Sequence, residues 1–196
     1  MNVVIIKYGA GNIRSVDYAL RRLHIEPVIT DDPVAIRRAD RVIFPGQGEA
    51  GTTMHYLREH RLDGVIRSLT QPVLGICIGM QLLCRHSEEG ATDCLGIFDA
   101  QVKRFVPRRH EDKIPHMGWN TLAGVGSRLL DPSTEGQYVY FVHSYYVPPT
   151  DDTAATTDYI HPFASAMQKH NFYAVQFHPE KSGAAGERIL SNFLNL

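Results

Sequence analysis

Cysteine, tryptophan and net charge are all scarce in this chain of 196 residues. Three cysteines are an odd number, which does not fit a disulfide framework, and no Cys-x-x-Cys pair offers a zinc site. Twenty Lys and Arg against 21 Asp and Glu leave a formal charge of −1, so no strong field attracts nucleic acid or an anionic membrane. No apolar run approaches the roughly 18 residues of a membrane span. We therefore expect a soluble, cytoplasmic protein that binds neither nucleic acid nor a membrane.

Short β-branched runs alternate with segments of helical periodicity through the first half of the chain. The runs predict strands at 3–6, 27–30, 41–44 and 72–76. Helical spacing of apolar residues lies between and after them, at 13–23, after Pro33, at 54–69 and from Met80. This alternation predicts an α/β fold with a mainly parallel central sheet flanked by helices.

The second half of the chain has more strand-like segments and fewer helical ones. They lie at 97–105, 138–147, 163–169 and 172–177. We expect antiparallel strands here, added to the edge of the sheet or packed over it, and a closing helix over 183–196. The chain has no internal repeat, low-complexity tract or linker, so we predict a single domain over 1–196.

The segment Gly75-Ile-Cys77-Ile-Gly79 lies between a predicted strand and a predicted helix. Glycines on both sides of a nucleophile permit the sharp turn that lifts its side chain out of the sheet. The unpaired N–H groups at the start of the helix favour a thiolate, and that of Ile78 could hold an oxyanion. A buried core cysteine is the alternative, and it is our interpretation of Cys84. Cys94, in a polar loop, is interpreted as incidental.

His178 and Glu180 follow the last predicted strand, on either side of Pro179. A strand that ends at His178 places this side chain on the rim where open α/β sheets keep their sites. Glu180 can then accept the second imidazole N–H and fix the tautomer. Taken alone, the motif favours a solvated turn. Together with Cys77, it favours a nucleophile, a base and an orienting carboxylate.

Two glycine-rich loops follow other strands, at 8–12 and 45–48. The second can aim peptide N–H groups into a pocket, so Gln47 or Gly48 could supply a further oxyanion donor, although such loops are usually only turns. The first lacks the third glycine of a dinucleotide loop, and its Asn12 is expected to cap the next helix. A basic stretch at 103–113 lacks interleaved aromatic residues and is interpreted as a solvated loop or part of a partner surface.

These motifs, in this order and spacing, resemble the class I glutamine amidotransferases over essentially the whole chain. The resemblance implies a flavodoxin-like fold and a Cys-His-Glu triad that hydrolyses glutamine without a cofactor or a metal. Additional segments at 8–15, 115–120, 141–145 and 178–182 are similar to one branch of this family. In that branch the glutaminase subunit delivers ammonia to a (β/α)₈-barrel cyclase subunit in histidine biosynthesis.

The resemblance also implies a role for individual residues. Cys77, His178 and Glu180 would form the triad, and Ile78 with Gln47 or Gly48 the oxyanion hole. Glutamine would be held by Gly46, Gly48, Gln81, Glu89, Ser144 and Tyr145. The cyclase subunit would contact Tyr8, Asn12, Met117, Trp119, Asn120 and Lys181. Gln47 departs from the small apolar residue expected there, which leaves the identity of the second oxyanion donor open.

Other interpretations stay open. Trp119, beside a glycine in a polar loop, could be an anchor for a partner or an aromatic plug over the local core. The chain as a whole could be a glutaminase subunit of another biosynthetic pathway, or a non-catalytic binding subunit with the same fold. A cysteine peptidase or γ-glutamyl hydrolase acting alone is a further alternative.

Overall fold

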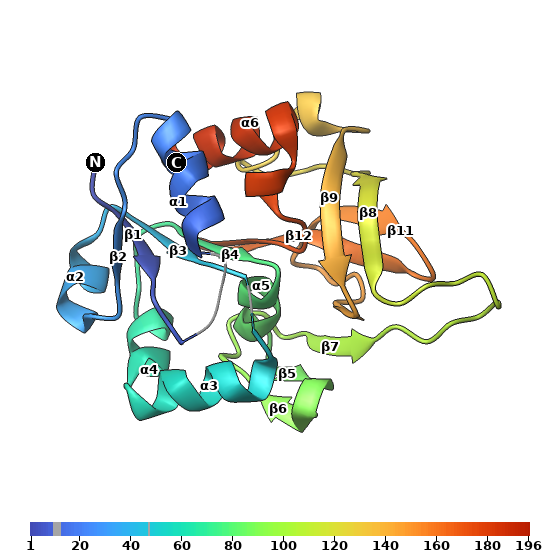
Figure 1. Ribbon diagram of the computed structural model, residues 1–196, viewed down its shortest axis with the longest axis horizontal. Helices are drawn as coiled ribbons and strands as arrows, with labels where there is room; N and C mark the ends of the chain where they lie inside the picture. Colours follow the sequence, from blue (N-terminus) through green and yellow to red (C-terminus); the bar gives the residue numbers. More distant parts are fainter. Residues whose placement is uncertain (10–12, 47) are drawn as a thin grey trace.

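A computed structural model describes residues 1–9, 13–46 and 48–196, with a seven-stranded sheet at its centre (Figure 1). The strand order is β11-β12-β13-β4-β3-β1-β2. Five strands pair in parallel: β1 (Val3–Ile6), β2 (Val28–Thr30), β3 (Arg41–Phe44), β4 (Val73–Ile76) and β13 (Phe172–Val175). At one edge β12 (Pro162–Lys169) and β11 (Thr153–Asp158) are antiparallel. The prediction of a mainly parallel central sheet is confirmed.

Helices cover both faces of this sheet (Figure 1). On one face lie α1 (Ile13–Arg22) and α6 (Gly183–Leu194). On the other lie α2 (Pro33–Arg38), α3 (Ala50–Glu59), α4 (Leu62–Arg67) and α5 (Ile78–Leu83). In β1, Val3 and Ile5 pack under the first pair and Val4 and Ile6 under the second group, all fully buried. A strand covered on both faces requires apolar side chains at successive positions, which is the pattern of residues 3–6.

Two smaller sheets lie beside the main one. β8 (His116–Thr121) and β9 (Tyr138–His143) form an antiparallel ribbon. A four-stranded sheet has the order β10-β7-β5-β6, with β10 at Tyr145–Tyr146, β7 at Gln101–Arg104, β5 at His86–Ser87 and β6 at Thr92–Asp93. Short 3₁₀ turns are η1 (Glu89–Ala91), η2 (Pro132–Thr134) and η3 (Pro179–Lys181). Only Ser144 separates β9 from β10, so this residue lies where the chain passes from one small sheet to the other.

Several predictions for the second half need correction. The strand at 172–177 was expected to be antiparallel, and β13 is antiparallel to β12. On its other side, however, it runs parallel to β4, with Val175 opposite Ile76. The strand at 97–105 is reduced to β7. Residues 116–121, interpreted as a loop around Trp119, form β8. The apolar residues of β8 point outward, so its pattern lacks the buried alternation that identifies a strand from sequence.

The two other cysteines are both buried. Cys84, interpreted as a core cysteine, is fully buried, and it follows the end of α5 at Leu83 with extended backbone angles. Cys94, interpreted as incidental in a polar loop, follows β6, but its side chain is buried and belongs to the hydrophobic core. Among the helices of the described ranges, none is long and apolar enough to cross a membrane.

Candidate active site

Cys77 forms the sharp turn between β4 and α5. Its backbone has φ 51° and ψ −109°, an unfavourable conformation for a residue with a side chain. Gly79 allows the turn to pack against β3, because a Cβ there would lie 2.2 Å from the Phe44 carbonyl oxygen. A Cβ on Gly75 would lie 2.9 Å from the backbone of Gly79. The glycines therefore provide close packing, whereas the backbone strain is at the cysteine itself.

The parallel pairing of β13 with β4 brings the segment after β13 next to Cys77. His178 was expected at the end of this strand, but the strand ends at Val175 and His178 immediately precedes η3. The backbone N–H of His178 donates to the Tyr140 carbonyl at 2.9 Å. The Ser182 hydroxyl donates to the His178 carbonyl at 2.6 Å and accepts from the Tyr140 N–H at 2.9 Å. These contacts tie the backbone of His178 to β9.

The His178 ring lies between Cys77 and Glu180 and is 3% exposed. Its Nδ1 is 2.8 Å from Glu180 Oε1, which leaves Nε2 for the hydrogen bond with Cys77. Burial lowers the pKa of His178, but hydrogen bonds and charges from Cys77 and Glu180 outweigh it and raise the pKa to about 10. The arrangement therefore favours an imidazolium that lies between the Cys77 sulfur and the Glu180 carboxyl group.

A cavity of about 280 Å³ opens beside Cys77. Seven of its lining residues were candidates from the sequence: Gly48, Cys77, Ile78, Gln81, Glu89, Ser144 and Tyr145. Gly46 lies under the nucleophile rather than in the lining, because a Cβ there would be 2.6 Å from the Cys77 Cβ. Ile78 is the first residue of α5, so its N–H is one of those without a partner inside the helix.

Glu89 brings a carboxylate to the cavity wall. Its Oε2 accepts a hydrogen bond from the Ala50 N–H at 2.9 Å. Burial raises the pKa of Glu89, that hydrogen bond lowers it, and the neighbouring charge of Glu49 raises it further, with a net upward shift. A cation bound in the cavity would oppose this shift by stabilising the ionised form.

Four residues beside the cavity or the sulfur were missed as site residues from the sequence: Pro115, Val142, His143 and Gln176. Gln176 Nε2 donates toward the Cys77 sulfur at 3.7 Å, and Val142 O lies 3.9 Å from the same sulfur. Gln81 Nε2 donates to both Gln176 Oε1, at 2.9 Å, and the Tyr145 carbonyl, at 3.0 Å. Gln176 immediately precedes Phe177-His178 in sequence, which was the available signal.

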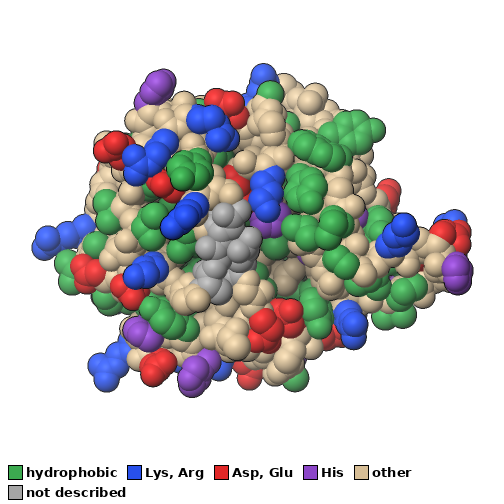
Figure 2. All heavy atoms as spheres, viewed as in Figure 1, with side chains coloured by type: hydrophobic (Ala, Val, Ile, Leu, Met, Phe, Trp, Pro, Cys, Tyr) green, Lys and Arg blue, Asp and Glu red, His purple; other side chains and the backbone are tan. Residues whose placement is uncertain are grey.

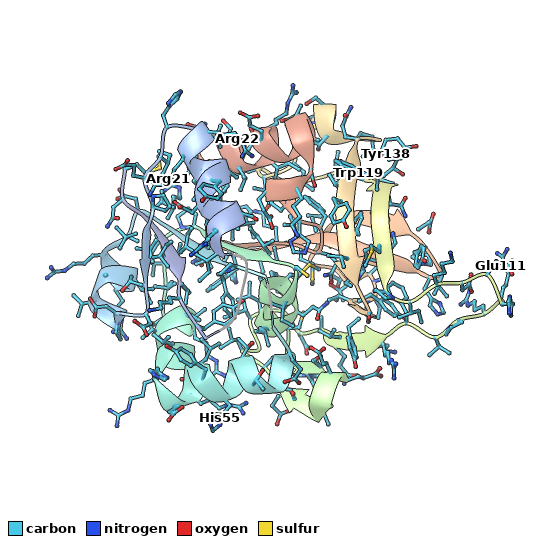
Figure 3. The ribbon with its side chains drawn as sticks, in the orientation of Figure 1. Arg21, Arg22, His55, Glu111, Trp119 and Tyr138 are labelled. Atoms are coloured by element: carbon cyan, nitrogen blue, oxygen red, sulfur yellow. The ribbon has the colours of Figure 1, made fainter. Side chains whose placement is uncertain are left out.

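The residues expected at a partner surface do not all lie on the surface. Met117 and Trp119 are 63% and 54% exposed on β8, and the ring of Trp119 (Figure 3) packs against that of Tyr140 on β9. Hydrophobic side chains gather over these two strands (Figure 2), and Lys181 is exposed in η3. Asn120 is half-buried, and its side-chain amide contacts the His116 ring and donates to the Asp158 carbonyl. Tyr8 is 2% exposed, because its ring packs against Phe44 and its hydroxyl donates to the Pro45 carbonyl.

Two predicted site residues, Asn12 and Gln47, lie outside the described residues. The expected helix cap at Asn12 and the choice between Gln47 and Gly48 as oxyanion donor therefore stay predictions. Gly48 has φ 126°, a backbone conformation open to glycine.

Comparisons with known protein families, sequences and structures agree with one another. The family model for glutamine amidotransferase class-I matches residues 4–196. The chain is 65% identical to the imidazole glycerol phosphate synthase subunit HisH of Bacteroides thetaiotaomicron and 47% identical to that of Escherichia coli K12, with complete coverage of each chain. The crystal structure of a putative GMP synthase subunit from Thermoplasma acidophilum shares the fold, with a TM-score of 0.75 at 20% identity, over 100% of this chain and 92% of that one.

The chain therefore belongs to the class I glutamine amidotransferases and is an enzyme of that class. Within the class, it belongs to the family of imidazole glycerol phosphate synthase HisH subunits. These relatives are named as one subunit of a synthase, which implies a partner subunit for them.

Proposed function

We propose that the chain hydrolyses L-glutamine to L-glutamate and ammonia and passes the ammonia to a cyclase subunit of imidazole glycerol phosphate synthase. The observation that carries this proposal is the His178 ring, hydrogen-bonded to Cys77 on one side and to Glu180 on the other. A buried imidazole between a sulfur and a carboxylate can hold a nucleophilic thiolate and then move protons to and from it.

Hydrolysis occurs in two steps. The Cys77 thiolate attacks the amide carbon, a C–S bond forms, and the C–N bond breaks as His178 gives its Nε2 proton to the departing ammonia. His178, now neutral, takes a proton from water that attacks the γ-glutamyl thioester. The C–S bond breaks, the thiolate returns, and the new carboxylic acid releases its remaining proton to solvent. Glu180 holds the ring in one orientation through Nδ1.

Two oxyanions form along this path, one before each bond cleavage. The Ile78 N–H at the start of α5 is one donor, and a peptide of Gln47 or Gly48 is the other. Removing one such donor costs on the order of 10²- to 10³-fold in rate. A partner that shifts the 46–48 loop would therefore switch the activity of the whole site.

The cavity has polar groups for the amino-acid end of glutamine. Glu89 can pair with the α-ammonium, which offsets the cost of burying its carboxylate. Gln81, Gly48 and the backbone of Ser144 and Tyr145 line the same space, and Gly46 keeps the adjoining backbone close. This set binds a substrate with both a charged end and an amide.

The cyclase subunit, a (β/α)₈ barrel, would dock over the exposed side chains of β8 and η3, and Met117, Trp119 and Lys181 would contact it. Exposed aromatic and methionine side chains are frequent anchors at such interfaces. Docking over the site prevents the loss of ammonia to solvent. Asn12 adjoins the same surface in the family pattern, whereas buried Tyr8 would act through its packing rather than by direct contact.

The test is Cys77→Ala in the presence of the cyclase subunit, with Cys94→Ala as the matched control. We expect Cys77→Ala to abolish formation of imidazole glycerol phosphate from glutamine while formation from added ammonia persists. Cys94→Ala should retain both. Glutamine consumption by Cys77→Ala at the parent rate would refute the nucleophile assignment, and rapid hydrolysis by the isolated chain would refute control by the partner.

A further inference from the structure

A chain of hydrogen bonds connects β8 to the wall of the cavity through two buried histidines. Asn120 Nδ2 lies 3.4 Å from His116 Nε2, and His116 Nδ1 lies 3.0 Å from His143 Nε2. His143 Nδ1 lies 2.7 Å from the carbonyl oxygen of Tyr145. That oxygen also accepts from Gln81, which continues through Gln176 to the Cys77 sulfur. Two arms of the network therefore meet at the Tyr145 carbonyl.

The groups at the two ends of this chain, the Asn120 amide and the Tyr145 carbonyl, determine which atom donates in each hydrogen bond. The Asn120 amide oxygen accepts from the Thr121 N–H and its Nδ2 donates to the Asp158 carbonyl, so Nδ2 is a donor toward His116 Nε2. A carbonyl can only accept, so His143 Nδ1 carries a proton toward Tyr145. The remaining contact is then His116 Nδ1–H donating to His143 Nε2. Both rings are neutral and protonated at Nδ1.

The surroundings of the two rings favour this uncharged state. The His116 ring stacks on Tyr159 at 4.0 Å and on Phe141 at 4.9 Å between centroids. His143 contacts Phe163 and Phe105, and among the described residues no carboxylate is a partner of either ring. Burial lowers the pKa of His116 to about 4. Burial, together with the charge of His178, lowers the pKa of His143 to about 3, against the raising effect of the Tyr145 carbonyl.

We propose that His116 and His143 are positioning residues of the glutaminase site: each locked as a neutral ring of one tautomer, they hold the Tyr145 carbonyl where it orients Gln81. This inference rests on the proposed function, because Gln81 is taken to contact glutamine. His143 also lines the cavity, directly before Ser144. Without the Nδ1–H donor of His143, the Tyr145 carbonyl is no longer held in position. Gln81, which donates to the same carbonyl, is then oriented less well, and glutamine binds less tightly.

The test compares two substitutions at one position. His143→Leu removes the donor, whereas the amide of His143→Asn keeps an N–H near the position of Nδ1. We expect His143→Leu to lower kcat/KM for glutamine by about tenfold, mainly through KM, and His143→Asn to recover most of the loss. His55→Leu, an exposed histidine of α3 (Figure 3), is the control and should match the parent. Thermal unfolding of each variant separates this effect from a loss of folding.

A second measurement requires no variant. Nitrogen-15 NMR of the histidine rings of the parent at neutral pH should show His116 and His143 protonated at Nδ1 only. A doubly protonated ring, Nε2 protonation in either, or equal kinetics for His143→Leu and His143→Asn would overturn the inference. If the parent released glutamate no faster than Cys77→Ala, the proposed function itself would fail and the positioning role with it. If the parent is active and His143→Leu has the same kcat/KM as the parent, only the positioning role is refuted.

Discussion

Two buried histidines of the site, His178 and His143, are held in opposite charge states by their neighbours. His178 is 3% exposed and His143 is 6% exposed, so burial alone does not distinguish them. His178 has a sulfur and a carboxylate as partners, and its pKa is raised. His143 has a carbonyl and another imidazole among aromatic rings, and its pKa is lowered. The hydrogen-bond partners of a buried histidine therefore decide its charge. A charged ring such as His178 can transfer a proton, whereas a neutral ring such as His143 positions its neighbours.

The largest expected effect follows from removing the carboxylate partner of His178. Glu180→Gln keeps an oxygen that can accept from Nδ1 but removes the charge that stabilises the imidazolium. We expect kcat/KM for glutamine to fall by about 10³- to 10⁴-fold, as for orienting carboxylates of other triads. The exposed substitution Glu187→Gln on α6 is the control, and steady-state glutamate release is the measurement. A loss below tenfold would contradict the role assigned to Glu180.

The neutral pair should make the fold sensitive to acid. The pKa values of His116 and His143 are about 4 and 3 in the folded chain, below the ordinary value of 6.5. The unfolded chain therefore binds more protons as the pH falls below 6.5, and the free energy of unfolding decreases. By pH 4.5 the loss should be on the order of 2 to 3 kcal/mol per ring, since one pKa unit corresponds to 1.4 kcal/mol.

Urea unfolding of the parent and of His116→Leu/His143→Leu at pH 7 and 4.5 measures this difference. The double variant should lose less stability than the parent between these pH values, because the two titrating groups are gone. Equal losses in both proteins would show that the two rings are not held neutral by the fold.

A smaller effect is expected at Gln176, through which the hydrogen-bond network reaches the Cys77 sulfur. Gln176→Leu removes the N–H that points at Cys77, and Gln176→Glu places a carboxylate there instead. We expect iodoacetamide to alkylate Cys77 about tenfold more slowly in Gln176→Leu, because one hydrogen bond to an ion contributes about 1.5 kcal/mol. Gln176→Glu should reduce glutaminase activity further, because a carboxylate repels the thiolate. An unchanged alkylation rate in Gln176→Leu would show that the Gln176 amide does not influence the Cys77 sulfur.

Much of the parallel half of the fold could be predicted because β1, β3 and β4 are buried on both faces, whereas β2 at the edge is largely exposed. Residues 3–6 and 41–44 are nearly continuous apolar runs, and the helices between them have regular spacing. β8 escaped prediction because Met117 and Trp119 point outward from it, which reverses the usual pattern. The parallel direction of β13 could not be predicted either, since it depends on pairing with β4, about 100 residues earlier.

The residues of the candidate site also separate into those that the sequence predicts and those that it does not. Cys77, His178 and Glu180 belong to short motifs whose chemistry is recognisable in sequence. His116 and His143 pair across two strands, 27 residues apart, and no local pattern distinguishes them from other single histidines. Their contact depends on the register of β8 and β9, in which His116 lies opposite His143. Only the folded chain brings this pair together.

The protonation state of His178 tests the central claim most directly. In the parent at about pH 8, nitrogen-15 NMR should show both ring nitrogens of His178 protonated, consistent with a pKa near 10. In Cys77→Ala one of the two partners that raise this pKa is gone, so the ring should titrate at lower pH. A singly protonated His178 ring in the parent at this pH, or the same titration in both proteins, would contradict an ion pair between Cys77 and His178.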